Sequence, residues 1–387
     1  MAGPESSDFL SAGRKMKVLH FFKTYYPDEY GGIQEVIRQL AEGGRAYGWE
    51  AEILALTPGR PGSIEVGGCP VRRVKRLFKA ASTDFAFRAL GEFKRLAAGA
   101  DLVHYHFPYP LADLAHFWAR HRKPCLVSYH SDIVAQRNLF LLYRPLMNLF
   151  LRSIPVIVAA SPGYMASSPV LRSYADRVRC IPYGLDEPPQ LAPALVESWR
   201  KRLPERFFLF VGAFRYYKGL DFLLTAAQGL PCPLVLVGEG GQERALKNRA
   251  AGLDNVHFLG ALPDEDKEAV LSLCYALVLP SHLRSEAFGL SLLEAARRGK
   301  PLISCEIATG TTYINVHFET GLAVPPADPA ALREALMTLW ENPPLAARLG
   351  AGARRRFEEL FTVEKMLRDY VDLYGELLDK ANRRGGG

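Results

Sequence analysis

Short apolar runs alternate along the whole chain with longer segments in which apolar residues recur every three or four positions. Short apolar runs are typical of strands buried on both faces, and the longer periodic segments are typical of helices that cover them. This alternation predicts an α/β fold in which crossover helices join parallel strands. The strands are expected at 17–22, 51–56, 70–74, 101–105, 125–129, 155–160 and 178–182 in the first half, and at 207–212, 233–237, 256–259, 276–280, 301–304 and 321–324 in the second.

The chain of 387 residues is longer than a single hydrophobic core usually supports. With two arrays of strands, this length predicts two Rossmann-like domains, one over 16–190 and one over 191–361. The boundary is expected within 184–198, which is rich in proline and lacks periodicity. Residues 1–15 are polar and predict a disordered lead-in. Residues 362–381 carry an apolar stripe at helical spacing, so they predict a final helix whose stripe packs against the protein.

Hydrophobic residues make up 49% of the chain and charged residues 23%, as is ordinary for a globular enzyme. The sequence contains no stretch of about 18 uncharged apolar residues and no secretory or mitochondrial signal, which predicts a cytoplasmic protein without a membrane span. The six cysteines are scattered without a C-x2-C pair. This spacing indicates buried reduced thiols and neither a zinc site nor a disulfide framework.

The formal net charge of +7 belongs to residues 1–190, which contain 24 lysines and arginines against 17 acidic residues. The densest basic cluster surrounds Leu77 and Phe78. Its members are Arg72, Arg73, Lys75, Arg76 and Lys79. A solvated face is one interpretation; attraction to an anionic membrane, worth about 1 kcal/mol per basic residue near the surface, is the other. No basic and aromatic residues interleave as in nucleic-acid binding, so a nucleic-acid partner is not expected.

Two glutamates eight residues apart, Glu286 and Glu294, carry the strongest functional signal. They follow the expected strand at 276–280, and ligands bind beyond the carboxyl ends of parallel strands. Both carboxylates could therefore bind one molecule with several hydroxyl groups. In the alternative, Glu286 complements a helix terminus and Glu294 is solvated. The intervening Phe288-Gly289-Leu290 favours the ligand role, because a glycine there allows close backbone approach and the helix face is apolar.

Arg215 and Lys218 follow the first strand of the second half, in the segment V-G-A-F-R-Y-Y-K-G-L. An arginine fork and a compact lysine charge suit a diphosphate, although a pair of exposed loop charges would look the same. Gly238 follows the next strand and could offer its backbone N–H to a phosphate. Glu243 stands where a dinucleotide fingerprint needs its last glycine, which excludes that motif.

A D-x-D pattern, Asp264-Glu265-Asp266, precedes a helix-like stretch. We interpret it as an N-cap with acids at the positive end of the helix, and we expect no divalent metal.

In the first half, Gly31 and Gly32 open a helix after the first strand, where the choice lies between a structural turn and a loop that meets an anion. His130 ends a strand, and Asp132 is the nearest carboxylate that could orient an acceptor hydroxyl. His104 and His106 end the preceding strand and are candidates to line the acceptor site. We expect these two histidines to point to different faces of the sheet.

The E-x7-E motif, the R-Y-Y-K-G-L segment and residues 304–326 resemble the retaining GT-B glycosyltransferases of family 4, in the branch of rhamnosyl- and mannosyltransferases. The resemblance extends from about residue 16 and is strongest over 207–326. It implies two Rossmann-like domains whose parallel sheets face each other across a cleft, with the final helix packed back on the N-terminal domain. In this branch, Thr309-Gly310-Thr311 replaces the usual glycine pair and could contact sugar or phosphate.

The resemblance also implies individual roles. Glu286 would bind the hydroxyls of the donor sugar and Glu294 the ribose, while His130 would line the donor sugar and the loop at Gly31-Gly32 would face the donor phosphates and the acceptor. The arginine of the family pattern stands two residues later here, at Arg215, and the lysine is unmoved.

Together these observations predict retaining transfer of mannose or D-rhamnose, from a GDP-sugar, to a hydroxyl of a lipid-linked or surface polysaccharide at the inner face of the membrane. Arg215 and Lys218 would stabilise the leaving phosphate without a metal or other cofactor. Two alternatives stay open at this stage: a nucleotide-sugar epimerase of the same architecture, and a catalytically silent scaffold subunit that binds sugar nucleotides.

Overall fold

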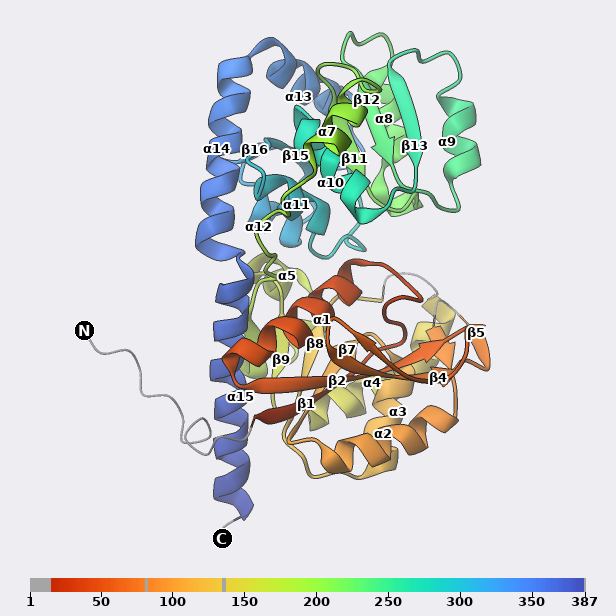
Figure 1. Ribbon diagram of the computed structural model, residues 1–387, viewed down its shortest axis with the longest axis vertical. Helices are drawn as coiled ribbons and strands as arrows, with labels where there is room; N and C mark the ends of the chain where they lie inside the picture. Colours follow the sequence, from red (N-terminus) through yellow and green to blue (C-terminus); the bar gives the residue numbers. More distant parts are fainter. Residues whose placement is uncertain (1–14, 81–82, 134–136, 386–387) are drawn as a thin grey trace, which may run out of the picture. The chain divides into compact units, whose positions relative to one another are not determined.

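The structure, a computed structural model shown in Figure 1, describes residues 15–80, 83–133 and 137–385. The expected lead-in therefore lies, apart from Lys15, outside the described residues. The chain forms two compact units. The N-terminal unit contains the chain up to Ala160, Ser168–Gly184 and the chain from Val363 on, and the C-terminal unit contains Ser161–Ser167 and Leu185–Thr362.

The N-terminal unit is built on an eight-stranded sheet in the order β10-β9-β8-β7-β1-β2-β4-β3. Its strands are β1 (Met16–Phe21), β2 (Trp49–Thr57), β3 (Gly62–Val66), β4 (Cys69–Lys75), β7 (Leu102–Phe107), β8 (Cys125–Tyr129), β9 (Ile157–Ala159) and β10 (Val178–Cys180). All neighbours pair in parallel except β3 and β4, which form an antiparallel hairpin at the edge. A small separate hairpin joins β5 (Phe78–Ala80) and β6 (Thr83–Phe85).

The sequence analysis did not predict the β3–β4 hairpin. Its two-residue turn is Gly67-Gly68, and both glycines have positive φ angles, 55° and 73°. Such a turn matches the twist of a hairpin, and a Gly-Gly pair between alternating residues is a signal that could have revealed it.

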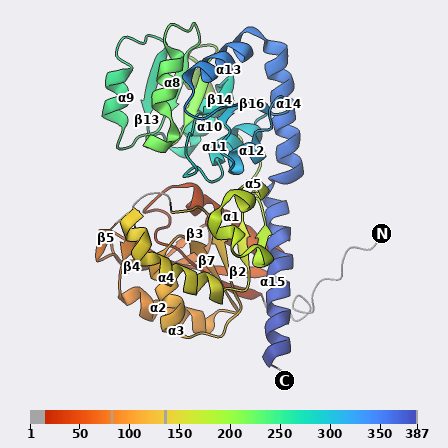
Figure 2. The ribbon, with the colours of Figure 1, turned by 180° about the vertical axis from the view of Figure 1, so that it is seen from behind.

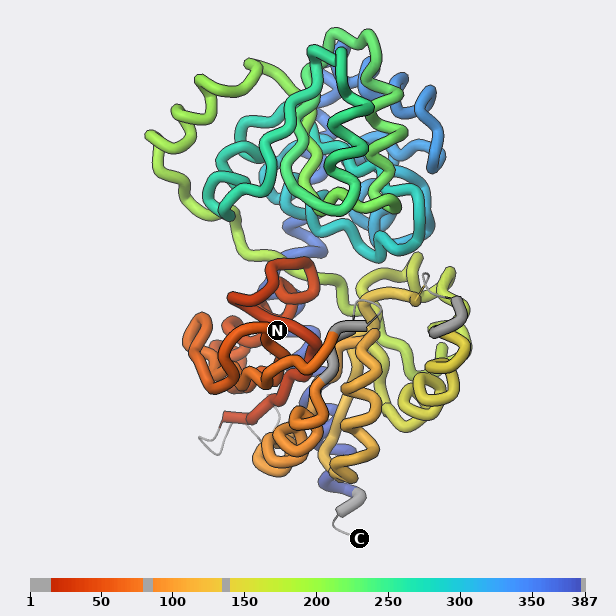
Figure 3. The backbone as a smooth tube through the Cα atoms, turned by 90° about the vertical axis from the view of Figure 1, so that its right-hand side faces the viewer, coloured from red at the N-terminus to blue at the C-terminus, as the bar shows by residue number. Residues whose placement is uncertain are grey.

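Helices cover both faces of the N-terminal sheet. They are α1 (Gly32–Gly43), α2 (Arg88–Gly99), α3 (Pro110–Ala119), α4 (Arg137–Ser153), α6 (Pro169–Arg172) and α15 (Val363–Gly385), with short 3₁₀ turns η2 (Gly44–Tyr47) and η3 (Ala175–Arg177). Helix α1 contacts α15, whereas α3 contacts α2 and α4. These two groups can be followed by their colours in Figures 2 and 3. Helix α15 buries its apolar stripe, including Tyr370 and Tyr374, within this unit.

The C-terminal unit contains a six-stranded parallel sheet in the order β13-β12-β11-β14-β15-β16. Its strands are β11 (Phe208–Val211), β12 (Leu234–Val237), β13 (Val256–Gly260), β14 (Ala276–Leu279), β15 (Leu302–Cys305) and β16 (Gly321–Val324). Its helices are α5 (Pro162–Ser167), α7 (Pro193–Arg200), α8 (Leu220–Ala227), α9 (Glu243–Arg249), α10 (Asp264–Leu273), α11 (Leu290–Ala296), α12 (Gly310–Ile314), α13 (Pro329–Glu341), α14 (Pro343–Leu360) and the 3₁₀ turn η4 (Tyr216–Lys218).

The strand order of the C-terminal sheet reverses beside β11, because the chain first adds β12 and β13 on one side and then β14 to β16 on the other. In open parallel sheets, ligands bind beyond the carboxyl ends of the strands at such a switch point. The loops after β11 and β14 are therefore the place to look for a site. None of the described helices is long and apolar enough to cross a membrane.

Alanine substitutions at two helical glycines test whether α14 packs closely against its neighbours. A Cβ atom at Gly350 in α14 would lie 2.2 Å from the carbonyl oxygen of Gly299, whereas one at Gly91 in α2 would meet nothing within 4 Å. We expect Gly350→Ala to lower stability by about 1–3 kcal/mol through overpacking. Gly91→Ala, the control, should raise it by up to about 1 kcal/mol, because alanine favours helix. Denaturant unfolding of the two variants measures both values, and a Gly350→Ala protein as stable as the native one would contradict the packing argument.

Candidate functional site

The loop after β11 is held in place by the loop after β12. The amide of Phe214 donates a hydrogen bond to the carbonyl oxygen of Glu239 (2.8 Å). A Cβ atom at Gly238 would lie 2.0 Å from the carbonyl oxygen of Gly212, so only glycine permits this contact. The N–H of Gly238 already donates to Gly260 (2.8 Å). Gly238 thus shapes the loop that carries Arg215 and Lys218, but its own N–H is engaged and is not available to a phosphate.

Lys218 and Glu286 form the centre of the candidate site. The Lys218 ammonium pairs with Oε2 of Glu286, and both side chains are nearly buried, at 12% and 11% exposed. The hydroxyl of Ser281 donates to the same carboxylate oxygen (3.0 Å). Gly219, with φ of 70°, brings the loop after β11 against the end of β14, since a Cβ there would lie 2.1 Å from the carbonyl oxygen of Pro280. Two predicted site residues far apart in the sequence therefore meet.

Burial lowers the pKa of Lys218, but the adjacent Glu286 carboxylate more than offsets this effect, so the pKa lies above its usual value. The lysine is therefore charged at neutral pH. Arg215 lies at the start of η4 with an exposed side chain, close enough for its charge to lower the pKa of Lys218. The loop presents two cations near one strand end, as an anionic ligand requires.

Glu294 lies on α11 and is paired as well. Lys267 of α10 donates to its Oε1 atom (3.1 Å) and also contacts Asp264 (3.2 Å). The Glu294 carboxylate raises the pKa of Lys267 well above its usual value. The side chain of Glu294 is only 18% exposed, so it is not the solvated surface residue of the alternative interpretation.

A tight backbone contact joins the loop before α11 to the start of α12. The amide of Gly310 donates to the carbonyl oxygen of Ala287 (2.8 Å), and a Cβ at Gly310 would collide with Phe288. Gly289 has a φ of 93°, a conformation that favours glycine, and Leu290 begins α11. The hydroxyls of Thr309 and Thr311 are buried 3.3 Å from each other, so in this structure they face inward.

The acids at 264–266 lie in the first turn of α10. The prediction of an N-cap is wrong in one respect, because Pro263 occupies the N-cap position and no side chain caps the helix. Asp264 contacts Lys267, and Asp266 accepts a hydrogen bond from the indole of Trp199 (2.7 Å). Partners within the protein and the positive helix end account for these acids.

In the N-terminal unit, Gly31 is the N-cap of α1, and both Gly31 and Gly32 are exposed. No side chain caps this helix, so its first N–H groups have no side-chain partner at the N-cap. A Cβ at Gly31 would lie 2.8 Å from Oε1 of Gln34, which itself donates to Thr24. With glycines at both positions, no side chain of residue 31 or 32 covers the start of α1.

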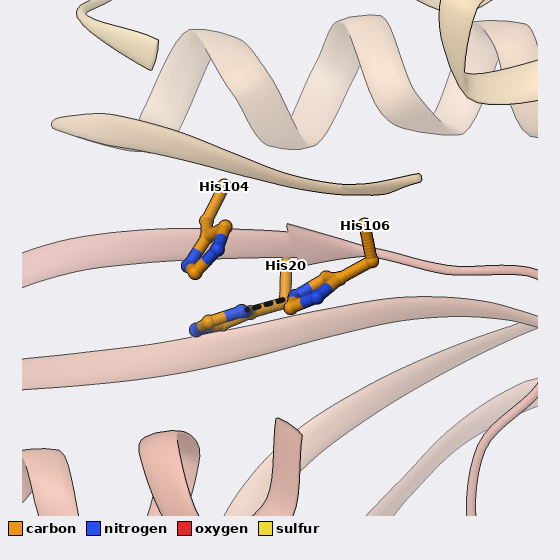
Figure 4. Close-up of side chains that lie close together, drawn as sticks. All are labelled: His20, His104 and His106. Atoms are coloured by element: carbon orange, nitrogen blue, oxygen red, sulfur yellow. Dashed lines mark hydrogen bonds between the residues drawn. The ribbon is translucent and has the colours of Figure 1, made fainter. Parts of the chain in front are cut away.

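The prediction that His104 and His106 point to different faces of the sheet is wrong. They are two residues apart on β7, and a strand returns a side chain to the same face at every second residue. Their rings lie 4.5 Å apart and nearly parallel. His20 of β1, the register partner of His104, joins them on the same face, as Figure 4 shows. All three are buried, so they line no open surface of this unit.

His130 follows β8 and is 4% exposed. Its Nε2 atom lies 2.9 Å from Nδ1 of His106, and its Nδ1 atom lies 2.5 Å from the hydroxyl of Tyr183. Asp132 accepts hydrogen bonds at Oδ1 from Tyr129 (2.9 Å) and Ser168 (2.6 Å). Both predicted residues stand at the strand end, but each is already held by neighbours.

The residues of these networks that were not predicted include Ser281, Lys267, His20 and Tyr183. Ser281 directly follows the apolar run that ends at Pro280, and His20 is a polar residue between the apolar Val18-Leu19 and Phe21-Phe22, so the sequence marked both. Lys267 and Tyr183 gave none, because only the fold brings them to Glu294 and His130.

Comparison with known proteins agrees with this geometry. The family described as "Glycosyl transferases group 1" matches residues 193–356, and the "Glycosyl transferase 4-like domain" matches residues 31–184. The chain is 52% identical to "D-rhamnosyltransferase WbpZ" of Pseudomonas aeruginosa, over 90% of this chain and 92% of that protein. It is 48% identical to "O-antigen chain mannosyltransferase C" of Escherichia coli, over 94% of this chain and 99% of that protein.

Among solved structures, the fold is similar to sucrose-phosphate synthase from Thermosynechococcus elongatus, with a TM-score of 0.78 at 25% identity over 95% of this chain and all of that chain. It is also similar to WaaG, a glycosyltransferase of lipopolysaccharide biosynthesis, with a TM-score of 0.66 over 92% of this chain and 99% of that chain. On this sequence identity, and with a parallel α/β sheet in each unit, the chain belongs to the GT-B glycosyltransferases of family 4, in the branch of rhamnosyl- and mannosyltransferases.

Proposed function

We propose that this glycosyltransferase moves mannose or D-rhamnose, with retention, from a GDP-sugar to a hydroxyl of a lipid-linked or surface polysaccharide. The observation that carries the proposal is the Lys218–Glu286 pair at the switch point of the C-terminal sheet. The names of the two relatives above, which share about half of its residues over nearly its whole length, support the choice of hexose and of a glycan acceptor.

In the proposed reaction, Arg215 and Lys218 bind the diphosphate and stabilise the charge that grows on it as the sugar leaves. Glu286, oriented by Ser281, accepts hydrogen bonds from hydroxyls of the sugar. Glu294, held at one oxygen by Lys267, has its other oxygen for the ribose. The acceptor hydroxyl enters on the side of the departing phosphate, and a phosphate oxygen takes its proton. The two cations supply the positive charge, so we propose that no divalent metal is required.

Removing the Lys218 charge tests this role. We expect Lys218→Met to lower kcat by roughly 10²- to 10³-fold, the usual cost of losing one group that stabilises transition-state charge. Hexose transfer from GDP-mannose or GDP-rhamnose to an acceptor glycan is the measurement. Lys247→Met is the control, because Lys247 forms an exposed pair with Glu243 on α9 and should leave kcat within about two-fold. Full activity of Lys218→Met would contradict the mechanism and favour a site elsewhere.

Nucleotide specificity can be measured without an acceptor. We expect GDP, at 100 times its dissociation constant, to stabilise the protein by about 2.7 kcal/mol. The thermal shift should persist in excess EDTA, since the diphosphate is held by Lys218 and Arg215, and should shrink in Lys218→Met. Stabilisation by UDP and not by GDP would overturn the assignment of the donor base, and a shift that EDTA abolishes would overturn the absence of a metal.

We also propose that the N-terminal unit meets the cytoplasmic face of an anionic membrane, through the outer face of α4. Leu141, Leu142 and Leu149 are 61%, 81% and 56% exposed there. Arg144 and Arg152 line the same shallow groove as Leu141 and Leu149. Trp118 of α3, a neighbouring helix, is also largely exposed. Apolar side chains flanked by basic ones are typical of helices that lie in a membrane interface.

The basic cluster near Leu77 is less suited to this role. Arg72 forms a two-pronged pair with Glu92, Arg73 contacts Asp28 at 3.6 Å, and Lys75 donates to backbone carbonyls. Two of its five basic side chains, those of Arg72 and Arg73, therefore already lie beside carboxylates of the same unit.

Vesicle binding distinguishes the two surfaces. We expect the protein to co-sediment with vesicles that contain phosphatidylglycerol, less so as salt rises, because basic residues contribute to binding. Leu142→Glu combined with Leu149→Glu should reduce the bound fraction about ten-fold or more, since each change removes an inserted apolar group and adds repulsion. Leu77→Glu is the matched control and should bind as the native protein does. Loss of binding in Leu77→Glu alone would move the membrane surface to the basic cluster.

A further inference from the structure

Four buried side chains form a continuous row of hydrogen bonds in the N-terminal unit. Nδ1 of His20 lies 3.0 Å from Nε2 of His106, and Nδ1 of His106 lies 2.9 Å from Nε2 of His130. Nδ1 of His130 lies 2.5 Å from the hydroxyl of Tyr183. Figure 4 shows the first of these links as a dashed line. The row runs from the core of the sheet to its edge, where His130 stands.

Each ring in the row carries a single hydrogen on nitrogen. Burial lowers the pKa of His20 and of His130 to about 3, and it lowers the pKa of His106 well below its usual value. The rings that contact the row are uncharged as well: His104 lies against His20 and His106, and Phe22 lies against His106 and His130. The hydrogen-bond partners of His104, Ser128 and Tyr374, are hydroxyl groups. Among the described residues, none of the hydrogen-bond partners of these histidines is a carboxylate that would favour imidazolium.

Neutral rings force all the hydrogen bonds of the row to run in one direction. A neutral imidazole donates from one nitrogen and accepts at the other. If His20 donates to His106, then His106 must donate to His130, and His130 must donate from Nδ1 to Tyr183. In the opposite arrangement, Tyr183 donates inward, and every ring carries its hydrogen on Nε2.

The inner end of the row decides between these directions. Nε2 of His20 is buried and has no partner within the described part of the chain. If the hydrogen bonds run outward, from His20 towards Tyr183, Nε2 of His20 carries a lone pair that accepts no hydrogen bond. If they run inward, from Tyr183 towards His20, Nε2 of His20 is an N–H group without an acceptor. Buried N–H groups without acceptors are the rarer of the two in proteins, so the outward direction is favoured.

A metal ion does not fit these histidines. Both nitrogens of His104 already have oxygen partners, Tyr374 at 2.8 Å and Ser128 at 2.7 Å. Its ring lies nearly parallel to that of His106, with centroids 4.5 Å apart, so their in-plane lone pairs do not converge on one point.

We propose that the row is a directional relay that presents a hydrogen-bond donor at the sheet edge, with His20 and His106 as positioning residues for hexosyl transfer. The outermost donor is the Tyr183 hydroxyl or, when a substrate oxygen takes the place of Tyr183, Nδ1–H of His130. Its ligand is therefore an oxygen acceptor, such as a hydroxyl or phosphate oxygen of the sugar nucleotide, and His130 does not act as a base. This inference rests on the proposed function and on the role at the donor sugar that the family resemblance implies for His130.

Nitrogen-15 NMR of the histidine rings in the full-length protein tests the direction itself. We expect His20, His106 and His130 all to carry hydrogen on Nδ1 between pH 6 and pH 8, although free neutral imidazole side chains favour Nε2. Hydrogen on Nε2 of His130 would overturn the relay, as would ring signals that change when the protein is dialysed against a metal chelator. This measurement requires no catalytic turnover, so its result does not depend on whether the proposed function is correct.

Variants at His20 test the consequence for transfer. In His20→Asn the amide can still donate to His106, so kcat should stay within about two-fold. In His20→Asp an ionised carboxylate only accepts, which reverses the row and moves the hydrogen of His130 to Nε2. We expect kcat to fall roughly 10- to 100-fold with KM nearly unchanged, as when a partner behind a functional histidine is lost. The new carboxylate should also raise the pKa of His106 and add a titration to the pH profile.

His116→Asn is the matched control. His116 is a largely buried histidine of the same unit, and it contacts hydroxyls, of Tyr105 and Ser153, at both nitrogens. This change should alter neither the His130 signal nor kcat. If His20→Asp does not fold, the spectra of the native protein and of His20→Asn still test the direction of the hydrogen bonds. Equal kcat values and equal His130 signals in His20→Asp and His20→Asn would overturn the relay. Absence of GDP binding or of hexose transfer in the native protein would instead contradict only the proposed function.

Discussion

One nearly buried ion pair, between Lys218 and Glu286, joins the two loops that form the proposed donor site. The lysine follows β11 and the glutamate follows β14, strands that are distant in sequence but adjacent in the sheet. Their meeting requires Gly219, whose missing side chain lets one loop reach the backbone of Pro280. Removing one partner of such a pair leaves an uncompensated charge, so the two residues hold each other in place before any ligand arrives.

The two units offset the unfavourable free energy of burying polar groups in different ways. The C-terminal unit pairs charges, since Lys218 meets Glu286, and Lys267 meets Glu294. The N-terminal unit keeps its buried histidines neutral and links them by hydrogen bonds to each other and to tyrosines of α15 and the segment after β10. A charged site suits a diphosphate, whereas a neutral row can fix the direction of a hydrogen bond without attracting counterions.

The sequence predicted every parallel strand of both sheets to within two or three residues, because runs buried on both faces are nearly continuous in apolar residues. It did not predict β3, because exposed and half-buried residues alternate in this strand and its sequence is not an apolar run. The Gly67-Gly68 turn that follows would have indicated a hairpin. The sequence also predicted that Lys218 and Glu286 act at one site, since each lies in a segment that follows a parallel strand, and the two side chains do meet. Partners such as Lys267 and Tyr183 could not be predicted, because no local pattern marks them and only the tertiary fold brings them to Glu294 and His130.

The arrangement of Lys218 suggests why the site is formed before the donor binds. A nearly buried ammonium is unfavourable unless an anion is close, and in this structure Glu286 is that anion. In the proposed reaction, a diphosphate bound between Arg215 and Lys218 would take over the role of counter-charge. The carboxylate of Glu286, still bound by Ser281, would then be free of Lys218 and would accept hydrogen bonds from the sugar hydroxyls. Under the proposed function, binding of the phosphate and orientation of the sugar would thus be coupled through one exchange of partners at Lys218.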